Sequence, residues 1–264
     1  MVIDFHTHAF PDAIAGRAIK SLCEGCGNKY TPCHNGTLAG LKKNMKNFGV
    51  DLSVVQPVMT NPRHFKTMND WAKEICGDGI ISFGALHPET EDYKKDIDYI
   101  CSLGLRGIKF HPEYQHFTID TKEMLKIYSY ALEKGLILLF HAGFDPAFPP
   151  PYHSSPRQFN NLWRELGGGT IVAAHLGGQK QWDEVPEFIG PTGIYIDTSM
   201  GFDYYSKEQF FRILSTLKSE RILFGSDAPW SRADKEIAAI KALDIPEADK
   251  QKILHINAEK LLGN

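Results

Sequence analysis

Histidine and aspartate residues stand directly after short apolar runs at widely separated points of the chain. The residues in these positions are His6, His8, His141, His175 and Asp227. Imidazole nitrogens and carboxylate oxygens are ligands that zinc and similar divalent ions take in proteins. His6 and His8 are two positions apart, so in a strand both side chains face the same side and can reach one ion. The pattern predicts a metal centre, with zinc as the first choice and iron, manganese or cobalt as alternatives.

The chemistry expected of such a centre is hydrolytic. An ion with an open position lowers the pKa of a water and polarises a substrate carbonyl, and a nearby carboxylate can carry the proton to the leaving group. Each residue alone also has a structural interpretation, since Asp227 precedes Ala228 and Pro229 and could cap a helix. Chance does not account for histidines at the same end of three strands and an aspartate at the end of a fourth.

Parallel strands are the elements that can bring these residues together. Eight apolar runs recur with helical patterns between them, and near-continuous apolar runs are typical of strands buried on both faces. The runs are Val2–Phe5, Leu52–Val55, Ile80–Leu86, Leu105–Phe110, Leu136–Phe140, Thr170–Ala174, Gly193–Ile196 and Arg221–Phe224. They predict an α/β fold, a single (β/α)8 TIM barrel over residues 1–264 with the metal site at its C-terminal mouth. An open doubly wound sheet is the alternative, but the Gly-rich turn that often follows its first strand is replaced here by HTHAFPD.

Helical periodicity and two long connections complete the predicted architecture. Apolar residues at a 3.6-residue spacing predict helices over 92–103, 124–132 and 210–217, and Pro246 could open a final one. Ala9–Asn35 and Ala142–Pro156 follow the first and fifth runs, whereas most such connections have about 2–6 residues. The proline run of the second favours extended backbone. We expect both connections to fold over the mouth and shape substrate access.

Composition and charge exclude several other classes of protein. The chain is 42% hydrophobic and 23% charged, as in ordinary globular proteins. A net charge of −3 offers no basic field to nucleic acid or to a membrane surface. No apolar stretch is long enough to span a membrane, and the start of the sequence lacks signal-peptide features. An odd count of five cysteines predicts the cytoplasm. The expected partner is a small-molecule substrate, and a homo-oligomer is left open.

Five motifs at the strand ends resemble the amidohydrolase superfamily of metal-dependent barrel hydrolases. In chain order they read DFHTHAFPD, GIKFHPEYQHF, FHAG, AAHLGG and FGSDAPW. They occur in the order of the family and span essentially the whole chain. Within the superfamily the sequence is most similar to the amidohydrolase-related branch, which includes the aminocarboxymuconate-semialdehyde decarboxylase-like enzymes.

The resemblance implies a role for each matching residue. His175 is implied to be a second-metal ligand or the residue that orients and activates the water. Lys109 falls where some members carry a carboxylated lysine that bridges two metals, but in the related branch it need not be a ligand, which favours one metal. Lys109, His111 and Arg106 become candidate substrate contacts, although Arg106 could equally cover a strand edge. The metal ligands implied by the resemblance are His6, His8, His141 and Asp227.

The connection after the first run departs from the family pattern. It carries Cys23, Cys26, Cys33 and His34, and three sulfurs with an imidazole could form a structural zinc site. The second half of this spacing is not standard, so reduced thiols are the alternative. A zinc site would make the connection rigid, whereas free thiols would leave it able to act as a lid.

Two enzymatic functions and one non-enzymatic function remain open. The first is a hydrolase of a C–N or C–O bond in an amide, lactone or ester, with Asp227 shuttling the proton. The second is a metal-dependent, non-oxidative decarboxylase of an unsaturated or aromatic acid, which needs a cation for the carboxylate. The third, a zinc-ribbon-like binding module built on the cysteines, is disfavoured by the acidic balance and the complete barrel mouth. The candidates for the decarboxylase cation are Arg17, Arg63, Arg106, Arg157 and Arg232.

Overall fold

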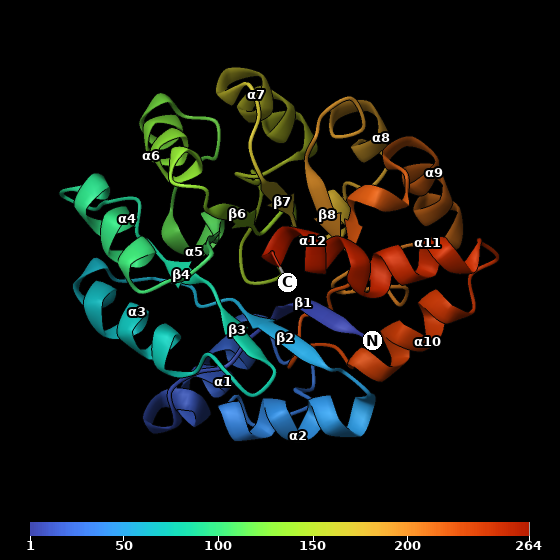
Figure 1. Cartoon of the computed structure of the whole chain (residues 1–264), viewed down its shortest axis with the longest axis horizontal. Helices are drawn as coiled ribbons and strands as arrows, with labels where there is room; N and C mark the ends of the chain where they lie inside the picture. Colours follow the sequence, from blue (N-terminus) through green and yellow to red (C-terminus); the bar gives the residue numbers. More distant parts are fainter. Residues whose placement is uncertain (264) are drawn as a thin grey trace.

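Short parallel strands form the wall of a barrel that helices surround (Figure 1). The computed structural model describes residues 1–263. Each strand that pairs with a neighbour does so in parallel. The strands are β1 (Ile3–Thr7), β2 (Leu52–Val55), β3 (Ile80–Ser82), β4 (Gly84–Ala85), β5 (Gly107–Phe110), β6 (Ile137–Phe140), β7 (Ile171–Ala173), β8 (Tyr195–Asp197) and β9 (Ile222–Leu223).

Backbone hydrogen bonds continue the barrel across the two places where regular strand pairing stops. The third predicted strand is divided at Phe83 into β3 and β4, and the Phe83 amide donates to the carbonyl of Val55 over 3.0 Å. Where the last strand meets the first, the Asp227 amide donates to the carbonyl of His6 over 2.8 Å. The predicted TIM barrel is therefore confirmed.

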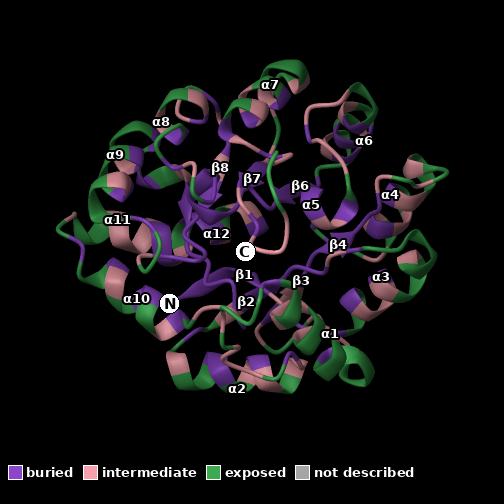
Figure 2. Cartoon of the chain, turned by 180° about the vertical axis from the view of Figure 1, so that it is seen from behind, coloured by how far each residue is buried: buried purple, intermediate pink, exposed green. Residues whose placement is uncertain are grey.

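Helices alternate with the strands and place their exposed faces on the outside of the molecule (Figure 2). They are α1 (Asp12–Gly25), α2 (Leu38–Phe48), α3 (Phe65–Glu74), α4 (Tyr93–Ser102), α5 (Pro112–Gln115), α6 (Lys122–Glu133), α7 (Pro156–Leu166), α8 (Val185–Phe188), α9 (Lys207–Leu217), α10 (Ala233–Lys241), α11 (Glu247–Gln251) and α12 (Asn257–Leu262). α4, α6 and α9 confirm the periodic segments, and α11 begins after Pro246 as expected. Within residues 1–263, no helix combines the length and the apolarity that crossing a membrane requires.

The apolar core has an inner layer inside the barrel and an outer layer between barrel and helices. In β6, Ile137 and Leu139 belong to the inner layer, whereas Leu138 and Phe140 belong to the outer one. This alternation follows from the two-residue period of a strand. Because both faces are covered, the strand sequences are apolar throughout rather than alternating.

The last helix closes the end of the barrel opposite to the mouth. α12 crosses the centre of the ring in Figure 1, and its Ala258 and Leu262 belong to the inner apolar layer. A π-helical turn over Lys252–Ile256 joins α12 to α11. The barrel is therefore plugged at the end where its strands begin.

The two long connections differ from each other in structure. Ala142–Pro156 has no helix or strand before α7 begins at Pro156, as its proline run predicts. Ala9–Asn35 was expected to be a loop, but its residues Asp12–Gly25 form α1. Alanine, leucine and lysine in this segment favour a helix. Ile14, Ala18 and Leu22 recur at helical spacing, but this face of α1 lines the mouth rather than the core, and Ala15 is the buried residue of the helix.

Candidate metal centre at the barrel mouth

An irregularity in β1 points both His6 and His8 into the mouth. Phe5 belongs to the inner apolar layer, and strict alternation would then turn His6 outward. The pairing register with β2 shifts between Asp4 and Thr7. Irregularities of this kind re-aim side chains beside active sites. The rings of the two histidines consequently lie close together, with centroids 5.2 Å apart.

Hydrogen bonds on the far side of each ring fix the position of its proton. Carboxylate and carbonyl oxygens only accept, so Nδ1 of His6 donates to Oδ2 of Asp197 and Nδ1 of His8 donates to the carbonyl of Gln56, each over 2.9 Å. In the neutral form of each ring, the Nε2 atom then carries a lone pair. Burial, assisted by the nearby amine of Lys109, holds the pKa of His6 well below its ordinary value, so this ring is neutral.

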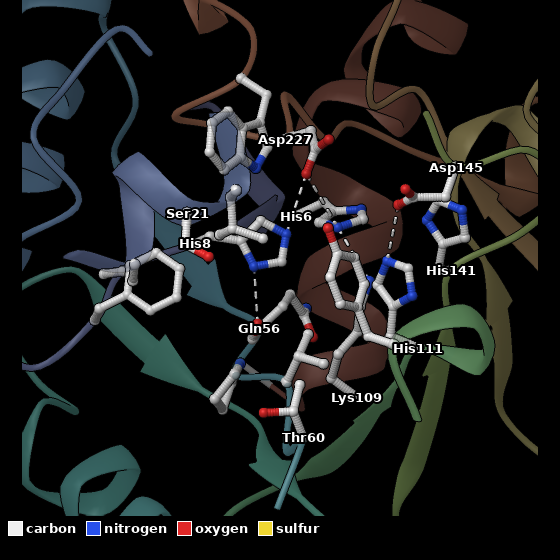
Figure 3. Close-up of a pocket in the computed structure, with 18 of the residues that line it drawn as sticks. His6, His8, Ser21, Gln56, Thr60, Lys109, His111, His141, Asp145 and Asp227 are labelled. Carbon is white, nitrogen blue, oxygen red and sulfur yellow. Dashed lines mark hydrogen bonds and ion pairs between the residues drawn. The ribbon is translucent and has the colours of Figure 1, made fainter. Parts of the chain in front are cut away.

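Asp227 completes a group of three electron-rich atoms. Its Oδ1 lies 3.1 Å from Nε2 of His8 and 3.5 Å from Nε2 of His6, and Figure 3 shows the carboxylate facing both rings. With both rings neutral, the two Nε2 lone pairs and the carboxylate oxygen together attract a cation. Two imidazole nitrogens and a carboxylate oxygen are a donor set that suits a divalent ion. The residues present therefore fit the predicted metal.

The backbone at the mouth is strained in a way that the centre requires. Asp227 and His175 have positive φ angles of 65° and 56°, a region that costs energy for residues other than glycine. A Cβ atom at Gly225 would lie 2.9 Å from Cβ of His6. Glycine at this position lets the end of β9 approach β1 and brings Asp227 within reach of the histidines.

His141 and His175 form a second pair beside this group. Nε2 of His141 donates to the carbonyl of Phe144 over 3.2 Å. The Ser199 hydroxyl donates to a neighbouring carboxylate, so Nδ1 of His175 is the donor to Ser199 Oγ, over 2.9 Å. The two remaining lone pairs, on Nδ1 of His141 and Nε2 of His175, face each other at 2.9 Å. The five predicted residues are thus divided into a group of three and a pair, which adjoin where the rings of His6 and His175 lie 5.2 Å apart.

A cavity of about 940 Å³ opens above these side chains, a size typical of sites for small molecules. α1 contributes one part of its wall and the Ala142–Pro156 segment another, as expected of the two long connections. The predicted ligands that line the cavity are His6, His8, His141, His175 and Asp227.

Lys109 and His111 also line the cavity. Lys109 points inward from β5, is fully buried, and has its Nζ 3.1 Å from Nε2 of His6. Burial lowers the pKa of this amine to about 8, and two nearby carboxylates oppose the effect. The ring of His111 stacks on that of His141 with centroids 4.2 Å apart. Contact of either residue with a substrate stays a prediction.

None of the five candidate arginines lines the cavity, although Arg17 belongs to α1 and Arg63 precedes the lining residue His64. Arg106 stands just before β5, at the plugged end of the barrel, and donates to the carbonyl of Leu262 in α12. The side chain of Arg106 therefore contacts the last helix and does not line the cavity. Arg157 packs over the ring of Phe188, and Arg232 pairs with an acidic neighbour. Within residues 1–263, no arginine lines the cavity.

The four residues of the possible structural zinc site do not converge. At the end of α1, Sγ of Cys26 donates to the carbonyl of Cys23 over 3.2 Å, whereas Sγ of Cys33 donates to the carbonyl of Ser231 over 3.2 Å. Nδ1 of His34 accepts a backbone amide. In the part of the chain that the structure describes, no three of these four side chains bring ligand atoms within 4.8 Å of one another. The structure therefore does not bring these four side chains together, and the structural zinc site stays a prediction.

Three residues with no assigned role from the sequence support the mouth. Asp197 accepts from the ring of His6 and from the amide of His175. Gln56 orients the second histidine of the HxH motif through its carbonyl. Both stand at strand ends, the same signal that marked the ligands. Asp145 lines the cavity from an irregular segment, and no sequence pattern pointed to it.

A parallel barrel with histidine and aspartate side chains gathered at its C-terminal mouth defines the class of metal-dependent barrel enzymes. The family model described as Amidohydrolase (Amidohydro_2) matches residues 3–263. The chain belongs to this amidohydrolase family, which confirms the resemblance seen in the five motifs. No curated protein matches the chain.

Solved structures share the fold over nearly the whole chain. An uncharacterised TIM-barrel protein of Bordetella bronchiseptica is 18% identical with a TM-score of 0.80, covering 99% of this chain and 98% of its own. A 5-carboxyvanillate decarboxylase of Novosphingobium aromaticivorans, solved with manganese, is 14% identical with a TM-score of 0.75, covering 100% and 96%. A protein of Pseudomonas putida described as a candidate 2-pyrone-4,6-dicarboxylic acid hydrolase is 16% identical with a TM-score of 0.66, covering 99% and 97%.

Proposed function

We propose that this chain is a metal-dependent hydrolase that cleaves a C–N or C–O bond in an amide, lactone or ester of a small molecule. The observation that supports the proposal is the group formed by His6, His8 and Asp227. Its three facing atoms are two imidazole nitrogens and a carboxylate oxygen, and they lie at the floor of a large cavity. A bound divalent ion, with zinc as the first choice, supplies a water of lowered pKa and a polarised carbonyl.

The chain's own residues have distinct roles in this proposal. His6, His8, His141 and Asp227 hold the ion. The Asp227 carboxylate accepts the proton of the attacking water and delivers it to the leaving group. His175 orients this water, or it would serve as a ligand to a second ion. The contact of 2.9 Å between the rings of His141 and His175 supports either a shared proton or such an ion, and metal analysis distinguishes the two.

A decarboxylase acting on an unsaturated or aromatic acid is the second candidate. The likeness to a 5-carboxyvanillate decarboxylase favours it, and Lys109 offers one cation to a carboxylate. The cavity wall favours hydrolysis instead, because no arginine lines it within the described residues. A substrate carboxylate would have to be held by a single buried amine that already faces His6.

The two reactions release different products. The metal-loaded protein is incubated with simple lactones, N-acyl amino acids and hydroxybenzoates, and acid release is measured against CO2 release. The hydrolase proposal expects acid from a lactone or an amide and no CO2. CO2 from a hydroxybenzoate without acid from the other compounds would establish the decarboxylase.

Variants of the centre test the assigned roles. Asp227→Asn is expected to lower kcat by about 10²–10⁴-fold even with metal bound, because an amide cannot accept the proton. His6→Ala is expected to abolish turnover and reduce metal content while the circular dichroism spectrum is unchanged. Glu236→Gln serves as the control, since Glu236 is buried but lies outside the cavity wall. Full activity of metal-loaded Asp227→Asn would exclude Asp227 as the base.

Metal identity, location and assembly are also part of the proposal. Zinc is our first choice, although one solved relative holds manganese, and metal analysis of the purified protein decides between them. We expect the protein in the cytoplasm, in keeping with its five free cysteines. A homo-oligomer stays open to measurement by light scattering.

A further inference from the structure

α1 directs one side of the helix at the cavity. Ile14, Ala18, Ser21 and Leu22 line the cavity, and their spacing places them on one face of the helix. We call these four residues the α1 stripe. Ala15 is the buried residue of the helix, so the stripe itself does not pack into the core. Three of its four members are apolar and face a space that a ligand can fill.

Aromatic side chains form the rest of the upper wall. Tyr114 and Phe148 meet edge to face with ring centroids 4.8 Å apart, and both line the cavity with Tyr30, Trp71 and Trp230. Aromatic rings bury large apolar areas with little loss of conformational freedom. The wall above the metal centre is therefore suited to apolar groups.

Charged groups are few in this wall. Lys109 is the only lysine or arginine that lines the cavity within residues 1–263, and it lies at the floor beside His6. The Asp145 carboxylate lines the wall but already accepts the amide of Ala147 over 2.8 Å. Burial raises the pKa of Tyr30 to about 12, so this phenol is neutral. An anion placed against the α1 stripe would find no cation to replace its water.

We propose that the non-reacting part of the substrate is uncharged, is aromatic or branched aliphatic, and lies between the α1 stripe and the aromatic side chains of the upper wall. This inference rests on the proposed function, because it places the reacting bond at the metal centre below. It goes beyond that function by assigning the α1 stripe as the surface that selects the substrate.

Three phenols of similar shape and different charge test the inference by binding alone. They are 4-tert-butylphenol, 4-hydroxyphenyltrimethylammonium and 4-hydroxybenzoate. Calorimetric titration is performed on the full chain as purified and after removal of metal by chelation, so that a carboxylate gains nothing from an ion. We expect 4-tert-butylphenol to bind at least about tenfold more tightly than either charged compound, because the wall favours apolar area and charge is costly to desolvate.

Two variants with the same change in charge locate the binding surface. Leu22→Asp puts a carboxylate into the α1 stripe and is expected to weaken 4-tert-butylphenol binding at least about tenfold. Gly16→Asp puts a carboxylate on the opposite face of α1, where an added side chain meets nothing within 4 Å, and is expected to leave binding unchanged. Circular dichroism checks that both variants are folded.

The outcome of this experiment is separate from that of the activity assay. Preference for either charged phenol in the metal-free chain, failure of all three to bind, or equal effects of the two variants would overturn the inference, whatever reaction the enzyme performs. Release of CO2 with intact preference for 4-tert-butylphenol would instead overturn the hydrolase and leave the apolar surface established.

Discussion

At the scale of single residues, the position of one proton on each imidazole decides whether the mouth can hold an ion. The oxygens of Asp197 and Gln56 accept from Nδ1 of His6 and His8. The Nε2 atoms that face Asp227 are consequently bases. The competence of the centre therefore depends on groups behind the ligands as well as on the ligands themselves.

Replacing Asp197 by asparagine is expected to reverse the ring of His6. Asparagine can keep accepting the amide of His175 through its oxygen, which turns its NH2 group toward Nδ1 of His6. Nδ1 must then accept, and the proton moves to Nε2, where it blocks ligation. We expect metal affinity to fall by about 10–100-fold, measured by competition with a chelator.

The matched control for Asp197→Asn is Glu236→Gln, which also neutralises a buried carboxylate but touches no ligand. We expect it to keep its metal affinity. Equal affinities in wild type and Asp197→Asn would show that this aspartate does not set the proton on His6.

Glu236 itself makes stability depend on pH. Burial raises the pKa of this carboxyl from 4.5 to about 7, the Ser231 hydroxyl that donates to it over 2.8 Å opposes the shift, and the Asp203 and Asp4 carboxyls add to it. A carboxyl whose pKa is higher when folded binds its proton more tightly in the folded state. Ionisation of Glu236 therefore leaves the free energy of unfolding unchanged below pH 4.5 and lowers it progressively between pH 4.5 and about 7. Above about pH 7 the reduction is complete and constant.

Glu236→Gln is expected to remove this loss of stability. The free energy of unfolding of the variant, relative to wild type, should rise by about 3 kcal/mol between pH 4.5 and 7 and then stay constant. Urea unfolding at half-unit steps of pH measures the difference. A difference that does not change with pH would contradict the assignment.

The residues of the centre could be predicted because they obey a rule of position. The carboxyl ends of the parallel strands meet at one mouth, so a histidine or aspartate that directly follows an apolar run is expected at that mouth. Arg106 precedes its strand instead of following it, and it therefore lies at the other end of the barrel. Asp145 follows no run, and only the folded chain shows where its irregular segment lies.

At the scale of elements, the Ala142–Pro156 segment is held by one buried carboxylate of α5. Glu113 accepts from both the backbone amide and Nδ1 of His153, each over 2.8 Å. The side chain of Glu113 is only 2% exposed. Because Phe144 and Phe148 of the same segment line the cavity, this contact fixes part of the substrate wall.

Glu113→Ala is expected to loosen this segment. An unpaired buried amide costs about 1–3 kcal/mol, so amide hydrogen exchange over residues 142–155 should accelerate while the strands keep their protection. Glu113→Gln is the control, since its amide oxygen can accept from the His153 amide and its NH2 can donate to Nδ1 of that ring. Unchanged exchange in Glu113→Ala would mean that other contacts hold the segment.

Element types were predictable to the extent that an element packs on the core. The strands and α4, α6 and α9 bury apolar residues at a regular period, so their sequences reveal them. α1 was missed although Ile14, Ala18 and Leu22 recur at helical spacing. The shift of register in β1 was missed because pairing with β2 is not written in β1 alone. Both exceptions lie at the mouth.

At the scale of the whole molecule, chemistry and stability occupy opposite ends of the barrel. The ligands and the cavity lie where the strands end, and α12 packs into the barrel where the strands begin. Barrel enzymes commonly divide the two tasks in this way. The (β/α)8 arrangement was predictable from the number of apolar runs. The role of α12 as a plug was not, because the sequence of a final amphipathic helix does not show which surface it packs against. The single domain stays a prediction.

Leu262→Ala tests this division. Leu262 is fully buried in the inner layer, so its truncation should lower the free energy of unfolding by about 2–5 kcal/mol and leave kcat unchanged. Ile256→Ala, at a position 44% exposed in the same helical segment, should change stability by less than about 0.5 kcal/mol. Urea unfolding and steady-state kinetics measure both. A loss of kcat in folded Leu262→Ala would show that the two ends are coupled.

The closure between the last strand and the first has a consequence for how the chain is made. The hydrogen bonds from Ser226 to Asp4 join residues 222 positions apart. During synthesis β1 emerges from the ribosome long before its partner exists, with an unpaired edge and the side chains of Ile3 and Phe5 uncovered. Such edges can pair with other nascent chains, so we expect the growing polypeptide to be prone to aggregation until the last strand has been made.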